Sequence, residues 1–342
     1  MQWNFGRDNT KGGKVGMKKR SILSVIILSL TFCLASGSSF GATEWPSGRI
    51  TLLIPFKAGG SSDAMGRGLA KYWEKYLGVP IVIDNRDGAS SQVGTTIYSR
   101  LPTDGNSVYL GCQVYFSANI LVHNANYQFE QFDLLNIQQE DAVEIAVLNS
   151  SKYDNAESLF NAIRENPGQM TCGYIAGGPQ NIAASILRKE HGLEFKSVTY
   201  DNGNSLRTAL LGNHLDFMIG NSIGDISIAG KAKILVILGA KRSRVFPDVP
   251  TFSEIFGQAF PALSMSTFVA VHASVKEKYP ERYEKLLATY KQTLDDPEYQ
   301  QFLIKTKQDS INQYIGPEKS REVNAAIHEL VKTYRDSLIV QD

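Results

Sequence analysis

The stretch that decides the fold is Ile50–Asp63, which reads ITLLIPFKAGGSSD. Its first five residues form a continuous apolar run of strand length, and its Gly59-Gly60 pair marks a loop. A helix follows the loop, because apolar residues recur at every fourth position up to Leu77. We expect a serine of the Ser61-Ser62 pair to cap the start of this helix and Gly78 to end it. A strand, a glycine loop and a helix in this order indicate an α/β fold.

The same alternation of apolar runs and helical patterns continues along the chain. Further strands are expected at residues 81–83, 107–110, 143–148, 171–175, 217–219, 234–238 and 268–271. Further helices are expected at residues 156–165, 181–190, 281–294, 297–305 and 317–338, and after the turn Gly88–Ser91, where Val93, Ile97 and Leu101 recur at helical spacing. Strand–helix alternation of this kind implies a parallel sheet covered by helices.

Composition and charge place the chain among ordinary globular proteins. It has 342 residues, enough for roughly two domains with a core each, and 43% of them are hydrophobic. Its 35 basic and 34 acidic residues give a net charge of +1, which argues against a nucleic-acid binder that works through a strong cationic field. Residues 1–42 hold six of the basic residues and one of the acidic ones, so the remainder has 29 and 33 and a net charge of −4.

Residues 1–41 are typical of an N-terminal extension followed by a cleaved export signal. The basic cluster Lys18-Lys19-Arg20 precedes an apolar run, Ile22–Leu34, and then a segment of small residues, which is the order of a secretory signal. Cleavage after Gly41 would start the mature chain at Ala42 and deliver it to the periplasm. The apolar run is too short and too polar for a membrane anchor, which needs about 20 apolar residues. Whether Met17 is the true start stays open.

Cysteine and histidine give no sign of a metal site or a cofactor. Two cysteines, Cys112 and Cys172, remain after removal of the signal, which contains Cys33. They lie near the ends of two separate predicted strands, so we expect two buried thiols, although a disulfide between them stays open. The sequence has no CxxC or HExxH motif and no Cys/His cluster with zinc spacing, so neither a metal nor a cofactor is expected.

Two glycine loops are the strongest chemical signals. Both leave the carboxyl end of a predicted strand and enter a helix, which is where open α/β sheets bind ligands. The first, residues 55–63, offers backbone amides and hydroxyls that suit an anionic oxygen, and Lys57 adds a cation, although a capped turn without a ligand is the alternative. The second, residues 176–181, contains Pro179, which has no N–H, and Gln180 and Asn181 compensate with side-chain amides. Two such loops in different halves suggest two domains that face each other across a cleft.

The segment Gly220–Gly224, which reads GNSIG, indicates a different class of function. It fits the G-x-S-x-G pattern around a serine-hydrolase nucleophile, here Ser222, and it follows a predicted strand. Asp248 and His272 come later in the order that such a catalytic triad requires. The apolar stretch after the motif ends at Gly230, too soon for a full helix. A secreted serine hydrolase is therefore kept only as the alternative function.

A series of short motifs runs from Trp45 to the end of the chain. These motifs are Trp45-Pro46, Pro55-Phe56, Gly59-Gly60-Ser61-Ser62-Asp63, Asn85-Arg86 with Gly88-Ala89, Pro102-Thr103-Asp104-Gly105, Tyr200, Leu210-Leu211-Gly212 with Leu215-Asp216, Gly230-Lys231 and Pro247-Asp248-Val249-Pro250-Thr251. In order and spacing they resemble the Bug (TctC-type) family, the extracytoplasmic solute receptors of tripartite tricarboxylate transporters. The resemblance implies a periplasmic-binding-protein-like (type II) α/β fold with two α/β domains around a ligand cleft. Domain 1 would hold residues 42–143 and 265–342, and domain 2 residues 144–264.

The resemblance also implies how the protein works. It implies a non-enzymatic, monomeric receptor that captures a small organic carboxylate or an amino-acid-like ligand for membrane transporter subunits or a sensor, and no nucleic acid is expected as a partner. The implied ligand-binding residues are Phe56, Ala58, Gly59, Gly60, Ser61, Ser62, Asp63, Gln113, Ala176, Gly177, Gly178, Gln180, Asn181, Tyr200 and Asn221. Among them Asp63 would orient the far end of the ligand or cap the helix. The second loop lacks the Ser that the family usually has there and the His that it often has, so tricarboxylate specificity is not carried over.

Overall fold

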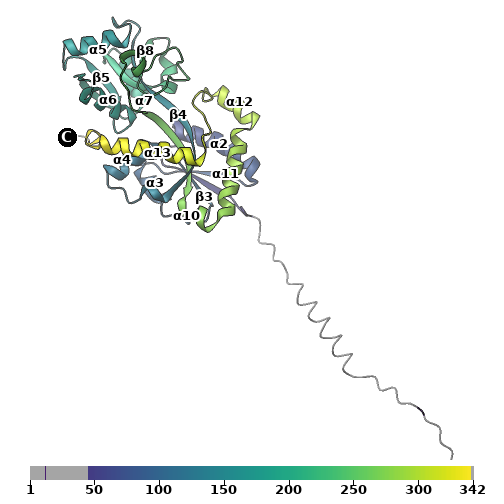
Figure 1. Cartoon of the computed structure of the whole chain (residues 1–342). Coiled ribbons are helices and arrows are strands. Elements are labelled where there is room, and N and C mark those ends of the chain that lie inside the picture. Colours follow the sequence, from purple (N-terminus) through teal and green to yellow (C-terminus); the bar gives the residue numbers. More distant parts are fainter. Residues whose placement is uncertain (1–11, 13–44, 340–342) are drawn as a thin grey trace, which may run out of the picture. The chain divides into compact units, whose positions relative to one another are not determined.

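The computed structural model describes residue 12 and residues 45–339, and the structural statements below concern residues 45–339 (Figure 1). The strands are β1 (Ile50–Ile54), β2 (Ile81–Asn85), β3 (Ser107–Gln113), β4 (Phe132–Leu148), β5 (Thr171–Ile175), β6 (Lys196–Tyr200), β7 (Phe217–Asn221), β8 (Ala232–Ile237) and β9 (Ser264–His272). The helices are α2 (Ser61–Leu77), α3 (Gln92–Tyr98), α4 (Tyr115–Leu121), α5 (Ala156–Glu165), α6 (Pro179–Lys189), α7 (Gly203–Leu211), α8 (Ser222–Asp225), α9 (Phe252–Phe256), α10 (Ala273–Lys278), α11 (Pro280–Leu294), α12 (Pro297–Lys305), α13 (Gly316–Thr333) and α14 (Arg335–Leu338). The expected export signal lies outside the described residues.

Within residues 45–339 the strands form one mixed sheet. Its order is β2-β1-β3-β9-β4-β7-β5-β6, and β8 pairs with β4. β1 runs parallel to β2 and β3 near one end, and β5 runs parallel to β6 and β7 at the other. Between these parallel groups β9 is antiparallel to β3 and β4, and β4 is antiparallel to β7 and β8. The α/β class is therefore confirmed, but the sheet is not parallel throughout.

β4 is a strand of 17 residues, of which the sequence predicted only the last part, residues 143–148. Its first half contains buried polar side chains that interrupt the apolar pattern, among them Asn136 and Gln138. Asn136 Nδ2 donates to the Gln313 carbonyl at 2.8 Å, and Gln138 Nε2 donates to the Tyr299 hydroxyl at 2.6 Å. These bonds attach the C-terminal helical region to β4 and remove the cost of burying the amides.

The core between sheet and helices follows the predicted helical spacing. α2 buries Met65, Leu69, Trp73 and Leu77. Trp73 is completely buried, and its Nε1 donates to Thr289 Oγ1 of α11 at 2.9 Å. Gly78 ends α2 in the left-handed conformation, as predicted, with its N–H donating to the Glu74 carbonyl. A separate apolar cluster surrounds β5 and β7 and includes side chains of α13. The division into two domains at the predicted boundaries stays a prediction.

α3 differs from its sequence pattern in the face that it buries. Val93 and Ile97 are 45% and 37% exposed, although they recur at helical spacing. Gly94 is buried instead, and a Cβ built there would lie 2.3 Å from the Arg86 carbonyl oxygen. Close backbone contact at Gly94 and burial of the Tyr98 ring therefore set the orientation of this short helix, and the predicted stripe of Val93 and Ile97 does not.

The two cysteines are free and buried, as predicted. Burial raises the pKa of both thiols, that of Cys112 to about 12, so both are protonated at neutral pH.

None of the helices in the described part of the chain combines the length and the apolar character that crossing a bilayer requires.

Candidate functional site

Two loops of the sheet share one backbone design. Loop 1 (residues 58–63, AGGSSD) follows the segment after β1, and loop 2 (residues 176–181, AGGPQN) follows β5. In loop 1 Gly59 has φ +82°, and its N–H donates to Asp63 Oδ2 at 2.8 Å. In loop 2 Gly177 has φ +69°, and its N–H donates to Asn181 Oδ1 at 3.1 Å. Each loop thus turns at a glycine with positive φ and closes on the side chain four residues later.

A second glycine in each loop leads directly into a helix. Gly60 and Gly178 are the N-cap residues of α2 and α6, and both have extended backbones with ψ of 175° and −176°. The prediction that a serine caps α2 is wrong, because the helix already begins at Ser61 and Asp63 closes the loop instead. The first N–H groups of a helix have no acceptor within it. Those of Ser61 and Ser62 find none elsewhere in residues 45–339, so they are free to bind an anionic oxygen.

A network of charged and amide side chains holds loop 1 in place. Arg67 donates from Nε to Asp63 Oδ2 at 2.9 Å and from Nη2 to Asn85 Oδ1 at 3.3 Å. Asn85 Nδ2 donates in turn to the Phe56 carbonyl at 3.1 Å. The hydrogen bond from Arg67 holds the pKa of Asp63 below its ordinary value. Asp63 therefore fixes the shape of the loop. The nearby Lys57 is exposed and has no ion-pair partner among residues 45–339.

Tyr115, the first residue of α4, lies against both loop regions. Its ring meets that of Phe56 edge-on, with ring centres 6.2 Å apart. Its hydroxyl lies beside loop 2, because a Cβ built on Gly178 would be 2.9 Å from Tyr115 Oη and 2.9 Å from Gln180 Oε1. The Gln180 side chain is completely buried, and neither of its amide atoms has a hydrogen-bond partner within residues 45–339. Burial raises the pKa of Tyr115, which keeps its phenol a neutral donor.

The other site residues predicted from sequence lie at strand ends. β5, β6 and β7 are parallel, so their carboxyl ends meet at one edge of the sheet, where Tyr200 and Asn221 join loop 2. Ala176 donates its N–H to the Tyr200 carbonyl at 3.2 Å. Gln113, at the end of β3, is completely buried and donates to the Asn324 side chain of α13. Tyr115 was not among the site residues predicted from sequence. The only signal for it in the sequence was its position two residues after Gln113.

A buried group of acids lies next to Asn221. Asp141 and Glu144 come from β4 and Asp225 from α8, and Arg207 Nη1 donates to Asp225 Oδ1 at 3.2 Å. Asn221 donates its side-chain amide to Asp141. Burial raises the pKa of Asp141 to about 7 and that of Asp225 to about 6. Burial, with the nearby Asp225 charge, also raises the pKa of Glu144 well above its ordinary value.

Ser222 belongs to this acid group and does not resemble a nucleophile. It is completely buried, and its Oγ donates to Glu144 Oε2 at 2.6 Å. The two proposed triad partners of Ser222 have other surroundings. His272 Nε2 lies 3.1 Å from the Ser99 carbonyl oxygen, and Asp248 is exposed in a loop. A catalytic serine needs a base within hydrogen-bond reach and access for its substrate. The serine-hydrolase alternative is therefore not supported.

Comparison with known proteins agrees with this geometry. Residues 65–334 match the sequence model of the tripartite tricarboxylate transporter family receptors, TctC. Protein BugT of Bordetella pertussis is 27% identical over 242 residues, which cover 68% of this chain and 72% of that protein.

Two solved structures confirm the fold. An R. palustris protein with adipate has a TM-score of 0.71 and 22% identity, and the match covers 86% of this chain and 98% of that one. MatC from Rhodopseudomonas palustris with bound malate has a TM-score of 0.67 and 20% identity, with 86% and 100% covered. Since the family match spans most of the sequence, this chain belongs to the tripartite tricarboxylate transporter receptors, as its motifs predicted.

Proposed function

We propose that this protein is a solute receptor that binds a small organic carboxylate between loop 1 and loop 2. The observation that carries the proposal is the matched geometry of the two loops. The free N–H groups of Ser61 and Ser62 at the start of a 17-residue helix suit one carboxylate group. The hydroxyl of Tyr115 and the unpartnered amide of Gln180 supply hydrogen bonds for a second polar group.

The class of ligand follows from these two sets of donors. One set on loop 1 and a second set at loop 2, to which α4 contributes Tyr115, suit a molecule with a polar group at both ends, such as a dicarboxylate or an amino acid. The two R. palustris relatives hold adipate and malate, which are molecules of this kind. Pro179 removes one backbone N–H from loop 2, so side chains such as Gln180 would hold that end of the ligand.

The same proposal covers location and partners. The protein would act in the periplasm after cleavage behind Gly41, as a non-enzymatic monomer that delivers its ligand to membrane transporter subunits or a sensor. Its support is the family membership together with the order of basic, apolar and small residues before Ala42. Mass spectrometry of the exported protein tests the location, because a mature chain that begins at Ala42 is expected, and an unprocessed chain would contradict it.

A thermal-shift screen against mono-, di- and tricarboxylates and amino acids tests the binding. A ligand at 100 times its dissociation constant stabilises the folded state by about 2.7 kcal/mol, or roughly 4 °C for a chain of this size. Gly178→Val should abolish the shift, because the added side chain would occupy the space between Tyr115 and Gln180.

Gly230→Val is the matched control, since a Cβ built on Gly230 meets nothing within 4 Å. Melting without ligand shows whether each variant folds, and Gly178 has an ordinary φ of −99° that valine tolerates. A screen without any carboxylate or amino-acid hit would overturn the proposal. An undiminished shift in Gly178→Val would place the ligand elsewhere.

A further inference from the structure

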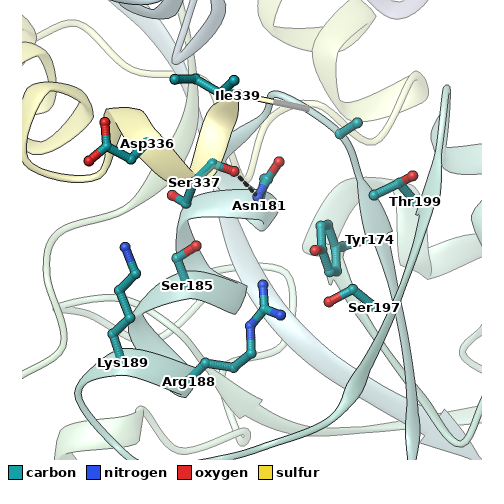
Figure 2. A pocket seen from close by; sticks show the side chains of 11 residues that line it. Tyr174, Asn181, Ser185, Arg188, Lys189, Ser197, Thr199, Asp336, Ser337 and Ile339 are labelled. Atoms are coloured by element: carbon teal, nitrogen blue, oxygen red, sulfur yellow. Dashed lines mark hydrogen bonds between the residues drawn. The ribbon is translucent and has the colours of Figure 1, made fainter. Parts of the chain in front are cut away.

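A polar pocket runs along α6, from Asn181 near its start to Lys189 at its end. Its volume is about 480 Å³, which is within the range of small-molecule sites. One wall is a single face of α6, and a second is one face of β6, the last strand of the sheet. The third wall is α14 and the residue after it. Figure 2 shows the side chains that line this space.

The pocket contains an excess of positive charge. Arg188 and Lys189 line it from the last turn of α6, and neither has an ion-pair partner among residues 45–339. The acidic residue in the lining is Asp336, whose Oδ1 lies 3.4 Å from the Nε of its neighbour Arg335. The charge of Asp336 is thus balanced from its own helix. Arg188 and Lys189 also complement the carbonyl end of α6, but that role does not require them to share a cavity.

Arg188 is positioned to bind an oxyanion. Its guanidinium lies over the Phe195 ring, 5.4 Å from the ring centre, which holds the side chain in place. In Figure 2 the Arg188 side chain extends from α6 into a space bordered by Ser185, Tyr174 and Ser197. Ser185 and Tyr174 are buried. A guanidinium presents parallel N–H donors that match two oxygens of a phosphate or carboxylate, and hydroxyls bind the remaining oxygens.

We propose that this pocket is a second anion site, in which Arg188 and Lys189 bind the phosphate group of a small molecule or the free phosphate ion. The two cations lie at the opposite end of α6 from the proposed carboxylate site, because loop 2 begins α6 and Arg188 and Lys189 end it. Ala176 and Asn181 of loop 2 also line this pocket, but the Asn181 side chain already bonds the Gly177 N–H and the Ser337 carbonyl. The inference therefore does not rest on the proposed function.

Calorimetric titration with inorganic phosphate, at constant ionic strength with chloride as the background anion, tests the site. Arg188→Ala/Lys189→Ala should raise the dissociation constant of phosphate by about tenfold or more, since it removes two charge-assisted partners. A parallel titration with glycerol phosphate distinguishes a phosphate ester from the free ion, and tighter binding of either one supports the site.

The matched control is Arg164→Ala/Lys196→Ala. It also removes one arginine and one lysine, both exposed, and Lys196 lies on β6 next to Ser197 but on the opposite face of the strand. This control should bind phosphate like the wild type. No phosphate binding by the wild type, wild-type affinity in the pocket variant, or equal weakening in both double variants would each overturn the proposal. Carboxylate binding, measured in the same variants, should be unchanged, so the two proposals fail separately.

Discussion

Raising the pH from 5 to 8 should destabilise this protein through the buried carboxyl of Asp141. Burial raises its pKa in the folded state to about 7, against an ordinary value of 3.8. The folded state therefore binds this proton more tightly than the unfolded state, so its contribution to stability is complete below pH 3.8 and is lost as the pH rises through 7. Glu144 shifts in the same direction and adds to the effect.

The size of the effect follows from the two pKa values. Between pH 5 and pH 8 the Asp141 carboxyl alone should lower the free energy of unfolding by roughly 2.5 kcal/mol. The pKa values of Asp63 and Asp296 are lowered in the folded state, so their contributions change only in more acidic solution. They do not offset the loss in this window. Burial lowers the pKa of His328 from its ordinary 6.5, so its contribution to stability rises with pH here and offsets a part of the loss.

Urea unfolding followed by circular dichroism at pH 5, 6, 7 and 8 measures the dependence. In Asp141→Asn the fall in the free energy of unfolding between pH 5 and pH 8 should be smaller by about 2.5 kcal/mol, because the amide does not titrate. Asp201→Asn, which changes an exposed carboxyl, should keep the wild-type dependence. Equal stability of the wild type at pH 5 and pH 8, or an unchanged dependence in Asp141→Asn, would refute the reasoning.

Two further substitutions test the site and the core. Tyr115→Phe should weaken carboxylate binding about tenfold in calorimetry and leave the melting temperature without ligand unchanged within about 2 °C, because it removes only a hydroxyl; unchanged affinity would remove Tyr115 from the site. Asp296→Ala should lower the free energy of unfolding by about 1–3 kcal/mol at pH 7, because Asp296 accepts hydrogen bonds from two N–H groups at the start of α12 and forms an ion pair with Lys75. A loss below 0.5 kcal/mol in urea unfolding would contradict the role of Asp296 as a cap.

Local patterns predicted the parts of the fold that depend on neighbours in sequence. β1, at Ile50–Ile54, and β5, at Thr171–Ile175, have the predicted bounds, because each is a short strand with mostly buried residues. The first half of β4 was not predictable in this way. Gln138 is buried there with a hydrogen bond to Tyr299, 161 residues away, and no local pattern contains that partner.

The candidate site shows the same limit. Glycine pairs before helices predicted both loops, because the conformation of Gly59 and of Gly177 depends on the residue itself. The closure of loop 1 by Asp63 depends on Arg67 and Asn85, so the cap was assigned to a serine instead. Tyr115 enters the site only through tertiary contact.

The measurement that tests the central claim most directly is a crystal structure with the carboxylate that gives the largest thermal shift. We predict carboxylate oxygens at about 3 Å from the N–H groups of Ser61 and Ser62, and a second polar group of the ligand within hydrogen-bond distance of Tyr115 or Gln180. A ligand bound away from both loops, or bound without contact to the start of α2, would contradict the account.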